Sequence, residues 1–134
     1  MNKHFTVPGE ARGKGRPRFG NGRTYTDSKT VEYENLVRAC FYTLGDTQIY
    51  EGPVKLELEV CCQVPKSEPK YTKRLMVDGM LRPTKRPDVD NIAKIIMDAL
   101  NGVAYRDDAQ VVELAVKKKY VADDPCVVVC LTSC

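Results

Sequence analysis

The chain has 134 residues, of which 43% are hydrophobic and 29% are charged, with 9 glycines and 8 prolines. This composition is typical of a globular protein and excludes collagen-like, low-complexity and wholly disordered chains. The formal net charge is only +3, so total charge alone indicates no particular partner. The length predicts a single domain spanning residues 1–134.

The apolar runs of the sequence are short. Segments such as Val127 to Leu131 fall far below the roughly 20 residues that cross a bilayer, and no apolar stretch typical of a signal peptide follows His4. We therefore expect a cytoplasmic protein with no membrane partner. In that reducing compartment the 6 cysteines are predicted to be free and mostly buried. No Cys-x-x-Cys pair occurs, which argues against a structural zinc site.

The N-terminal region combines short β-prone segments with a flexible stretch. Phe5 to Val7 and Thr24 to Thr26 are β-prone. Pro8 to Arg23 is rich in Arg, Gly and Pro and has no apolar periodicity, which predicts a mobile loop or an open hairpin. His4, the one histidine, is expected in a frayed terminus, so histidine-based nucleophilic catalysis is disfavoured.

A helix and a strand are predicted next. The helix is expected to be capped by Asp27 or Ser28 and to end at Gly45. Apolar residues at spacings of three and four predict its buried stripe: Tyr33, Leu36, Val37, Cys40, Phe41 and Leu44. Strict alternation from Val54 to Gln63 then predicts a strand with one buried face, formed by Val54, Leu56, Leu58, Val60 and Cys62.

The second half of the chain predicts two helices and two strands. Lys70 to Met80 is expected to be a short helix, and Leu81 to Pro87 an extended connection. Asp88 to Asn101 is the clearest helix, with Asp90 as N-cap and Gly102 just past its end. Its predicted buried stripe is Ile92, Ile95, Ile96, Ala99 and Leu100.

The last two strands complete the predicted fold. Val111 to Val116 and Cys126 to Leu131 indicate a terminal hairpin or a pair of neighbouring strands. Helices and strands interleave irregularly along the chain. We therefore expect an α+β domain, with helices packed on one face of a mixed β-sheet, and not a doubly wound parallel fold.

Acidic residues concentrate around the clearest helix. The segment 88–108 contains Asp88, Asp90, Asp98, Asp107 and Asp108. Asp90 and Lys94 are one helical turn apart and lie away from the isoleucine stripe, so they can touch. A reversal at Asn101-Gly102 would bring Asp107 and Asp108 back toward the polar side of the helix.

Crowded carboxylates repel one another unless a cation or hydrogen-bond donors stabilise them. An all-oxygen ligand set suits Mg²⁺, for which Mn²⁺ should substitute, and such an ion activates water toward a phosphodiester. Lys94 would help to hold a phosphate or the nucleophile. A structural interpretation stays open: Asp88 and Asp90 as partners of the helix dipole, Lys94 as a solvated lysine, and Asp107-Asp108 as a turn.

Two basic segments frame this acidic centre. Residues 1–30 and 66–86 each carry 7 Lys or Arg and 2 acidic residues. Such segments can follow the backbone of a polyanion, although a charge run is often only a solvated surface. The candidate DNA contacts are Lys14, Arg16, Arg18, Lys73, Arg74, Lys85 and Arg86. Phe19, Tyr25 and Tyr71 are candidates for stacking on bases, and Lys117 to Lys119 are expected to face mainly solvent.

The stretch from Arg86 to Asn101, which includes Asp88-Val-Asp90-Asn91 and Lys94, together with Asp107-Asp108-Ala-Gln110, closely resembles the RusA-type Holliday junction resolvases. The early segments Gly13-Lys-Gly-Arg-Pro-Arg-Phe19 and Tyr25-Thr-Asp-Ser-Lys-Thr30 are also similar to that family. The resemblance covers roughly residues 7–120.

The resemblance implies a small, usually phage- or prophage-encoded homodimer with a RusA-like fold. It would be an Mg²⁺-dependent endodeoxyribonuclease that resolves four-way DNA junctions by paired symmetric cuts in recombination and repair. By position, Asp88, Asp90 and Asp108 would be the essential metal-binding acids and Lys94 the catalytic lysine. Asp98 and Asp107 match acidic positions of less certain role.

Two other functions remain open from the sequence. A flap or replication-fork nuclease would keep the metal site and change the DNA substrate. A non-catalytic nucleic-acid-binding protein would use the same aspartates only for folding. The missing Cys-x-x-Cys pairs make a zinc-organised regulatory module a weaker third hypothesis.

Overall fold

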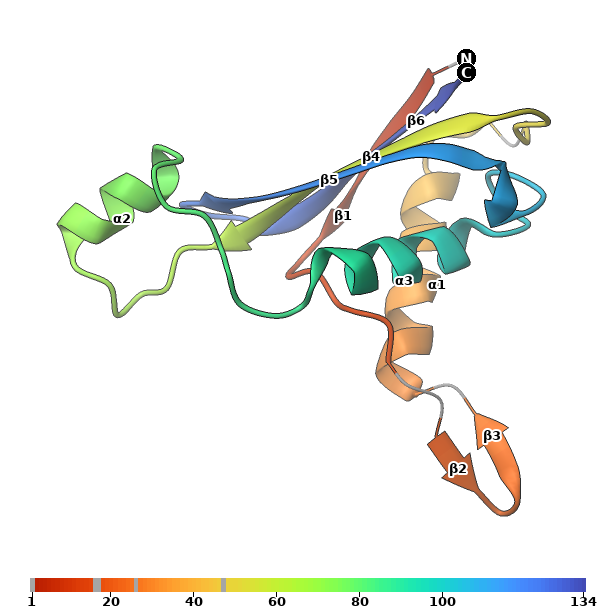
Figure 1. The fold of residues 1–134 in the computed structure, drawn as a ribbon, viewed down its shortest axis with the longest axis horizontal. Coiled ribbons are helices and arrows are strands. Elements are labelled where there is room, and N and C mark those ends of the chain that lie inside the picture. Colours follow the sequence, from red (N-terminus) through yellow and green to blue (C-terminus); the bar gives the residue numbers. More distant parts are fainter. Residues whose placement is uncertain (1, 16–17, 26, 47) are drawn as a thin grey trace.

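The computed structural model describes residues 2–15, 18–25, 27–46 and 48–134, and of Arg18 and Tyr25 only the backbone. Its main body is a four-stranded sheet with strand order β1-β6-β4-β5 (Figure 1). The strands are β1 (Asn2–Pro8), β4 (Val54–Gln63), β5 (Val111–Val121) and β6 (Cys126–Ser133). β6 is antiparallel to β1 and β4, whereas β4 and β5 are parallel. The sheet is therefore mixed, and the predicted α+β class is confirmed.

Two helices cover one face of this sheet, α1 (Ser28–Tyr42) and α3 (Val89–Leu100) (Figure 1). A third, α2 (Lys70–Val77), lies at the far end of β4 and β5. There Met76 packs with Val64 and Tyr120 in a small separate cluster. No helix in the described part of the chain is long and apolar enough to cross a membrane.

The core lies between the sheet and the helices α1 and α3. Alternation in β4 puts Val54, Leu56, Leu58 and Val60 on the helix side, and each is buried. The predicted stripe of α3 is confirmed, because Ile92, Ile95, Ile96, Ala99 and Leu100 are all fully buried. One helix face and one sheet face thus share a single apolar layer.

The stripe of α1 is narrower than predicted. Tyr33, Val37 and Phe41 are buried, but Leu36 is 37% exposed and Leu44 38% exposed. α1 contacts β1 at the sheet edge and α3 beside it, so its i, i+4, i+8 row is buried in the core, while Cys40 is only partly buried against it. Placing Leu36 and Leu44 in the core was therefore wrong.

The pairing predicted for the last two strands is also wrong. β5 and β6 are not neighbours, because β4 lies between them. Parallel strands need a crossover connection, and the chain from β4 to β5 supplies one through α2 and α3. The apolar strand β6 then pairs on both sides at the centre of the sheet, with β1 and β4.

Smaller differences concern caps and termini. Asp88, not Asp90, is the N-cap residue of α3, and Asp90 lies in the first turn. His4 belongs to β1, opposite Cys130, so that end is paired and not frayed. Cys61 is buried although the alternation predicted Cys62 at that depth. All six cysteines are free, as expected.

The Arg- and Gly-rich stretch includes a small hairpin. β2 (Arg18–Gly20) and β3 (Arg23–Tyr25) are joined through Asn21 and Gly22, which have φ of 52° and 74°. Positive φ at both positions is the twist that a two-residue hairpin prefers, and Asn-Gly adopts it readily. Figure 1 shows the hairpin projecting from the sheet beyond the start of α1. The open-hairpin alternative is thus confirmed for residues 18–25.

Two leucine truncations test the boundary of the core. Leu100→Ala removes a fully buried side chain and should lower the free energy of unfolding by about 2–5 kcal/mol. Leu36→Ala removes a partly exposed one and should cost less than about 1 kcal/mol. Urea unfolding followed by circular dichroism measures both. Equal losses would mean that α1 packs by the wider stripe.

Candidate functional site

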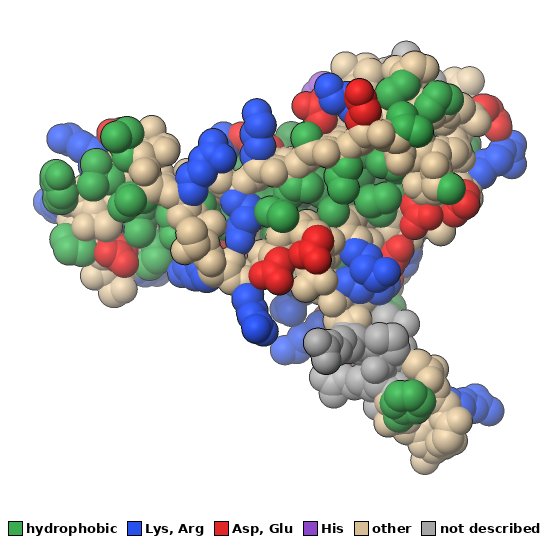
Figure 2. Space-filling model, viewed as in Figure 1, with side chains coloured by type: hydrophobic (Ala, Val, Ile, Leu, Met, Phe, Trp, Pro, Cys, Tyr) green, Lys and Arg blue, Asp and Glu red, His purple; other side chains and the backbone are tan. Residues whose placement is uncertain are grey.

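A shallow hollow of about 270 Å³ opens between α3 and β5. Four charged side chains line it, Asp90, Lys94, Asp98 and Asp108, together with apolar groups from Ala93, Met97 and Leu114. Figure 2 shows acidic and basic side chains gathered across the exposed face of α3, below an apolar band that follows β5. The hollow is open to solvent, so a large substrate can reach it.

α3 places three of these side chains in one row. Its isoleucine stripe is buried against the sheet, so residues on the opposite side must face solvent. Asp90, Lys94 and Asp98 are spaced by four and lie one above the other on that side. Asp88 precedes the helix with an exposed side chain and is not among the residues lining the hollow.

A tight return of the chain after α3 brings Asp108 to the same hollow. Tyr105 is fully buried below it, and its hydroxyl donates to the carbonyl of Met97 at 2.8 Å. Gln110 fixes the C-terminal end of the segment that connects α3 to β5, since its side-chain nitrogen donates to the carbonyls of Tyr50 and Gly52, each at 2.9 Å. The single 3₁₀ turn η1 (Asp108–Gln110) is therefore anchored. The expected approach of Asp108 to the polar side of the helix is confirmed.

The carboxylates of the hollow interact with one another. Burial, a hydrogen bond to Asp107 and the charges of Asp107 and Asp98 raise the pKa of Asp108, while Lys94 opposes the shift. Burial, followed by the charges of Asp108, Asp98 and Asp107, also raises the pKa of the Tyr105 hydroxyl. Negative charge therefore accumulates here beyond what Lys94 balances.

The donor chemistry of the hollow suits a hard divalent cation. Asp90 and Asp108 supply carboxylate oxygens from two elements, and the pKa of Asp108 is raised by burial first and by the neighbouring carboxylates of Asp107 and Asp98 second. Within the described ranges, however, no three His, Cys, Asp or Glu side chains are already grouped closely enough to hold an ion.

Lys14 is not placed as the sequence suggested. Its ammonium contacts the carboxylates of Glu34 at 2.7 Å and Asp98 at 3.0 Å, so it is bound inside the protein. Lys3 is also internal, with 6% of its side chain exposed and a hydrogen bond to the Gln48 carbonyl at 2.8 Å. A count of charges along the sequence could not predict these internal contacts, because the count does not show which lysines have partners in the folded protein.

Asp98 is the site residue to which sequence reasoning assigned no definite role. Its spacing was the available signal, because it follows Lys94 by four residues and Asp90 by eight.

The spacing of Asp90 and Lys94 on the helix would allow their side chains to touch, but the structure shows no such contact. Both are described and line the same hollow, yet no ion pair joins them.

Two other candidate DNA contacts come from the segment that precedes α3. Lys85 and Arg86 are exposed in the segment leading to α3. Lys118 is half-buried and donates to the carbonyls of Lys85 at 2.6 Å and Pro87 at 3.0 Å, so it anchors that segment and is not simply solvent-facing.

The remaining candidates lie on α2 and on the hairpin. Lys73 is half-buried and Arg74 exposed on α2. Arg16 and the side chains of Arg18 and Tyr25 lie outside the described residues. Two aromatic candidates for base stacking are open to solvent, with Phe19 84% and Tyr71 74% exposed.

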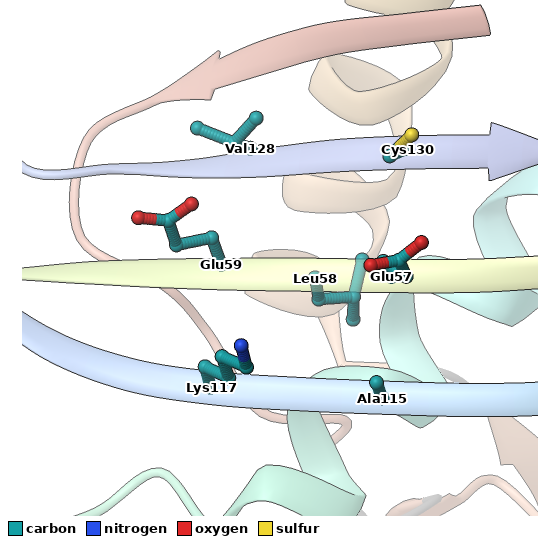
Figure 3. A pocket seen from close by; sticks show the side chains of 7 residues that line it. All are labelled: Glu57, Leu58, Glu59, Ala115, Lys117, Val128 and Cys130. Carbon is teal, nitrogen blue, oxygen red and sulfur yellow. The ribbon is translucent and has the colours of Figure 1, made fainter. Parts of the chain in front are cut away.

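A second hollow lies on the sheet face that no described helix covers (Figure 3). It contains Glu57 and Glu59 from β4 and Lys117 from β5. Its carboxylates already have lysine partners, since Glu59 pairs with Lys119 and Glu57 lies 3.6 Å from Lys55. This hollow is charge-balanced and is a weaker candidate for an anion- or metal-binding site.

Comparison with known proteins shows the family to which the chain belongs. The family model described as "Endodeoxyribonuclease RusA" matches residues 8–132. The chain is also 39% identical over 122 residues to "Uncharacterized protein YqaN" of Bacillus subtilis (strain 168), which covers 87% of this chain and 86% of that protein. The match includes both α3 and the connection from α3 to β5, which contains Asp108. The chain therefore belongs to the RusA endodeoxyribonuclease family.

Proposed function

We propose that this protein is an Mg²⁺-dependent endodeoxyribonuclease that resolves four-way DNA junctions by paired symmetric cuts in recombination and repair. The observation that carries the proposal is the open hollow where Asp90, Lys94 and Asp108 meet, within a chain of the RusA family. The whole chain, residues 1–134, would form one RusA-like endonuclease domain. It would act on DNA in the cytoplasm, and the gene that encodes it would lie on a phage or prophage.

Each side chain of the hollow has a distinct role in this proposal. Asp90 and Asp108, with Asp88 joining from the start of α3, would hold Mg²⁺, and Mn²⁺ would substitute. The bound ion would lower the pKa of a water molecule and neutralise charge on the phosphate. Lys94 is exposed beside these acids, so its ammonium would contact a non-bridging oxygen of the scissile phosphate.

Cations outside the hollow would hold the DNA backbone. Lys85 and Arg86 precede α3, and Lys73 and Arg74 lie on α2. Arg18 begins the hairpin strand β2, and Arg16 comes two residues before it in the sequence. All of these groups precede the acidic row in the sequence. α2 and the β2–β3 hairpin project from the main body at two separate places (Figure 1), and in this proposal they would contact different parts of a branched substrate.

The number of sites supports the proposal that the protein acts as a homodimer. The chain carries one acidic hollow with this composition among its described residues, and symmetric cleavage of a two-fold junction needs two. Two copies related by a two-fold axis would present one hollow to each of two opposing strands.

The first test is cleavage of a labelled synthetic junction. Wild-type protein should make paired cuts in the junction with Mg²⁺ or Mn²⁺ and none with EDTA. Asp90→Asn should reduce cleavage by at least about 10³-fold and leave junction binding intact, since it removes a ligand charge without touching the basic segments.

Two controls accompany this test. Asp123→Asn alters an exposed aspartate in the β5–β6 connection and should cut normally. A matched linear duplex should stay intact, whereas cleavage of flap or fork substrates at equal rates would make the protein a broader structure-specific nuclease. Binding without any cut in either metal would support a non-catalytic binder.

The cations that precede α3 predict a change in salt dependence. Lys85→Gln with Arg86→Gln should weaken junction binding and reduce the slope of log K against log salt by about 0.9 for each phosphate that the variant no longer neutralises. Lys117→Gln, on the helix-free face of the sheet, should leave the slope unchanged. Fluorescence anisotropy titrations over a range of salt concentrations measure both slopes. Equal slopes would remove Lys85 and Arg86 from the DNA-contact surface.

The dimer predicts a partial reaction. A heterodimer of one wild-type and one Asp90→Asn subunit should nick one strand and fail to make the opposing cut, because each hollow serves one strand. Denaturing gels of the two labelled strands, run on tag-purified heterodimers, distinguish a nick from paired cuts. Paired cuts at the wild-type rate would show that one hollow serves both strands.

A further inference from the structure

The segment Gly13-Lys14-Gly15 is wedged between α1 and α3. The Lys14 backbone nitrogen donates to the carbonyl of Asn91 at 3.1 Å, and the Gly15 nitrogen donates to Thr30 Oγ1 at 3.0 Å. A Cβ at Gly15 would lie 2.6 Å from Thr30 Oγ1, so only glycine fits there without a shift. The predicted mobile loop is therefore fixed at this point.

The side chain of Lys14 is held as firmly as its backbone. Its ammonium lies 2.7 Å from Glu34 on α1 and 3.0 Å from Asp98 on α3. All three side chains are largely shielded, with 20%, 12% and 28% of their surfaces exposed. Burial opposes the charged form of Lys14, but hydrogen bonds to the two carboxylates outweigh it and raise its pKa. This ion cluster joins the two helices directly beside the acidic hollow.

Asp98 has a second cation within reach. Lys94 precedes it by four residues on the same face of α3, a spacing at which lysine and aspartate pair on a helix. Lys94 nevertheless has no ion pair within the described residues, whereas Asp98 is bound to Lys14. Asp98 thus pairs with Lys14 of the N-terminal segment and not with Lys94 of its own helix.

We propose that Lys14 is a positioning residue: by binding Asp98, it keeps that carboxylate off Lys94 and leaves the Lys94 ammonium available for a substrate phosphate. The proposal rests on the proposed nuclease function, because it gives Lys94 a phosphate to bind. It also removes Lys14 from the DNA-contact surface, since its charge is already neutralised inside the protein.

Without Lys14 the balance of charge beside the hollow changes. Glu34 and Asp98 would be left partly buried and unpaired, which is unfavourable. Asp98 would then turn to Lys94 and compete with the phosphate for its ammonium. Neutralising Asp98 at the same time removes the competitor and returns Lys94 to the substrate.

A set of three variants tests this reasoning on the full-length protein. Lys14→Met should lower junction cleavage about threefold to tenfold at saturating Mg²⁺ and DNA. The double variant Lys14→Met with Asp98→Asn should cut faster than Lys14→Met alone. Lys14→Arg, which can keep both ion pairs, should cut close to the wild-type rate. A double variant no faster than the single one overturns the proposal.

A binding measurement without metal separates the alternatives. In EDTA, the double variant should show the wild-type salt slope for junction binding, because the charges it removes are internal. A slope reduced by about 0.9 would make Lys14 a direct phosphate contact and overturn the proposal. The matched control, Lys117→Met, removes a lysine from the helix-free face.

The two readouts keep this proposal separate from the proposed function. If the wild-type protein cuts no junction, the nuclease assignment fails, while the EDTA slope still decides whether Lys14 is internal. If circular dichroism shows that Lys14→Met does not fold, both junction cleavage and the salt slope in EDTA are measured on the double variant alone. Cleavage by the double variant below one tenth of the wild-type rate would then overturn the proposal.

Discussion

Five side chains of α3 are fully buried against the sheet, and their burial fixes the rotation of the helix about its axis. With that rotation fixed, Asp90, Lys94 and Asp98 have to project from the opposite side in one row. Any slip of the helix would expose isoleucines and move all three charges together. The energy that holds the site in place is therefore hydrophobic, although the groups that would do its chemistry are charged.

The second half of the site depends on hydrogen bonds and not on a helix face. Asp108 reaches the hollow because Tyr105 is buried below it and Gln110 binds two carbonyls of the segment before β4. These contacts join residues distant in sequence, so the return from α3 cannot shift without breaking them. A site assembled this way can hold like charges close together, because the scaffold around it resists their repulsion.

The sequence predicted the local elements well, because local periodicity determines them. The strand Val54–Gln63 and the buried face of α3 follow from the spacing of apolar residues, and so does the face that carries Asp90 and Lys94. Strand pairing is different, because the pattern of apolar residues within β5 or β6 does not show which strands are neighbours, and in the fold β4 lies between the two. The depth of Leu36 likewise depends on how α1 meets the sheet edge. The role of Lys14 was not predictable either, because its two carboxylate partners come from helices far from it in sequence.

The charge that this protein presents to a polyanion therefore depends on which charged side chains are exposed and unpaired, and not on the net charge of each sequence segment. Lys3 and Lys14 belong to the basic N-terminal segment, yet both are neutralised internally, so fewer cations there can meet a polyanion. The hollow itself is lined by the carboxylates of Asp90 and Asp108 and by the ammonium of Lys94. In the proposed function, DNA would be drawn to the flanking cations, and its phosphate could enter the hollow only together with a divalent ion. Binding and cleavage would then rest on different groups, and each can be weakened without the other.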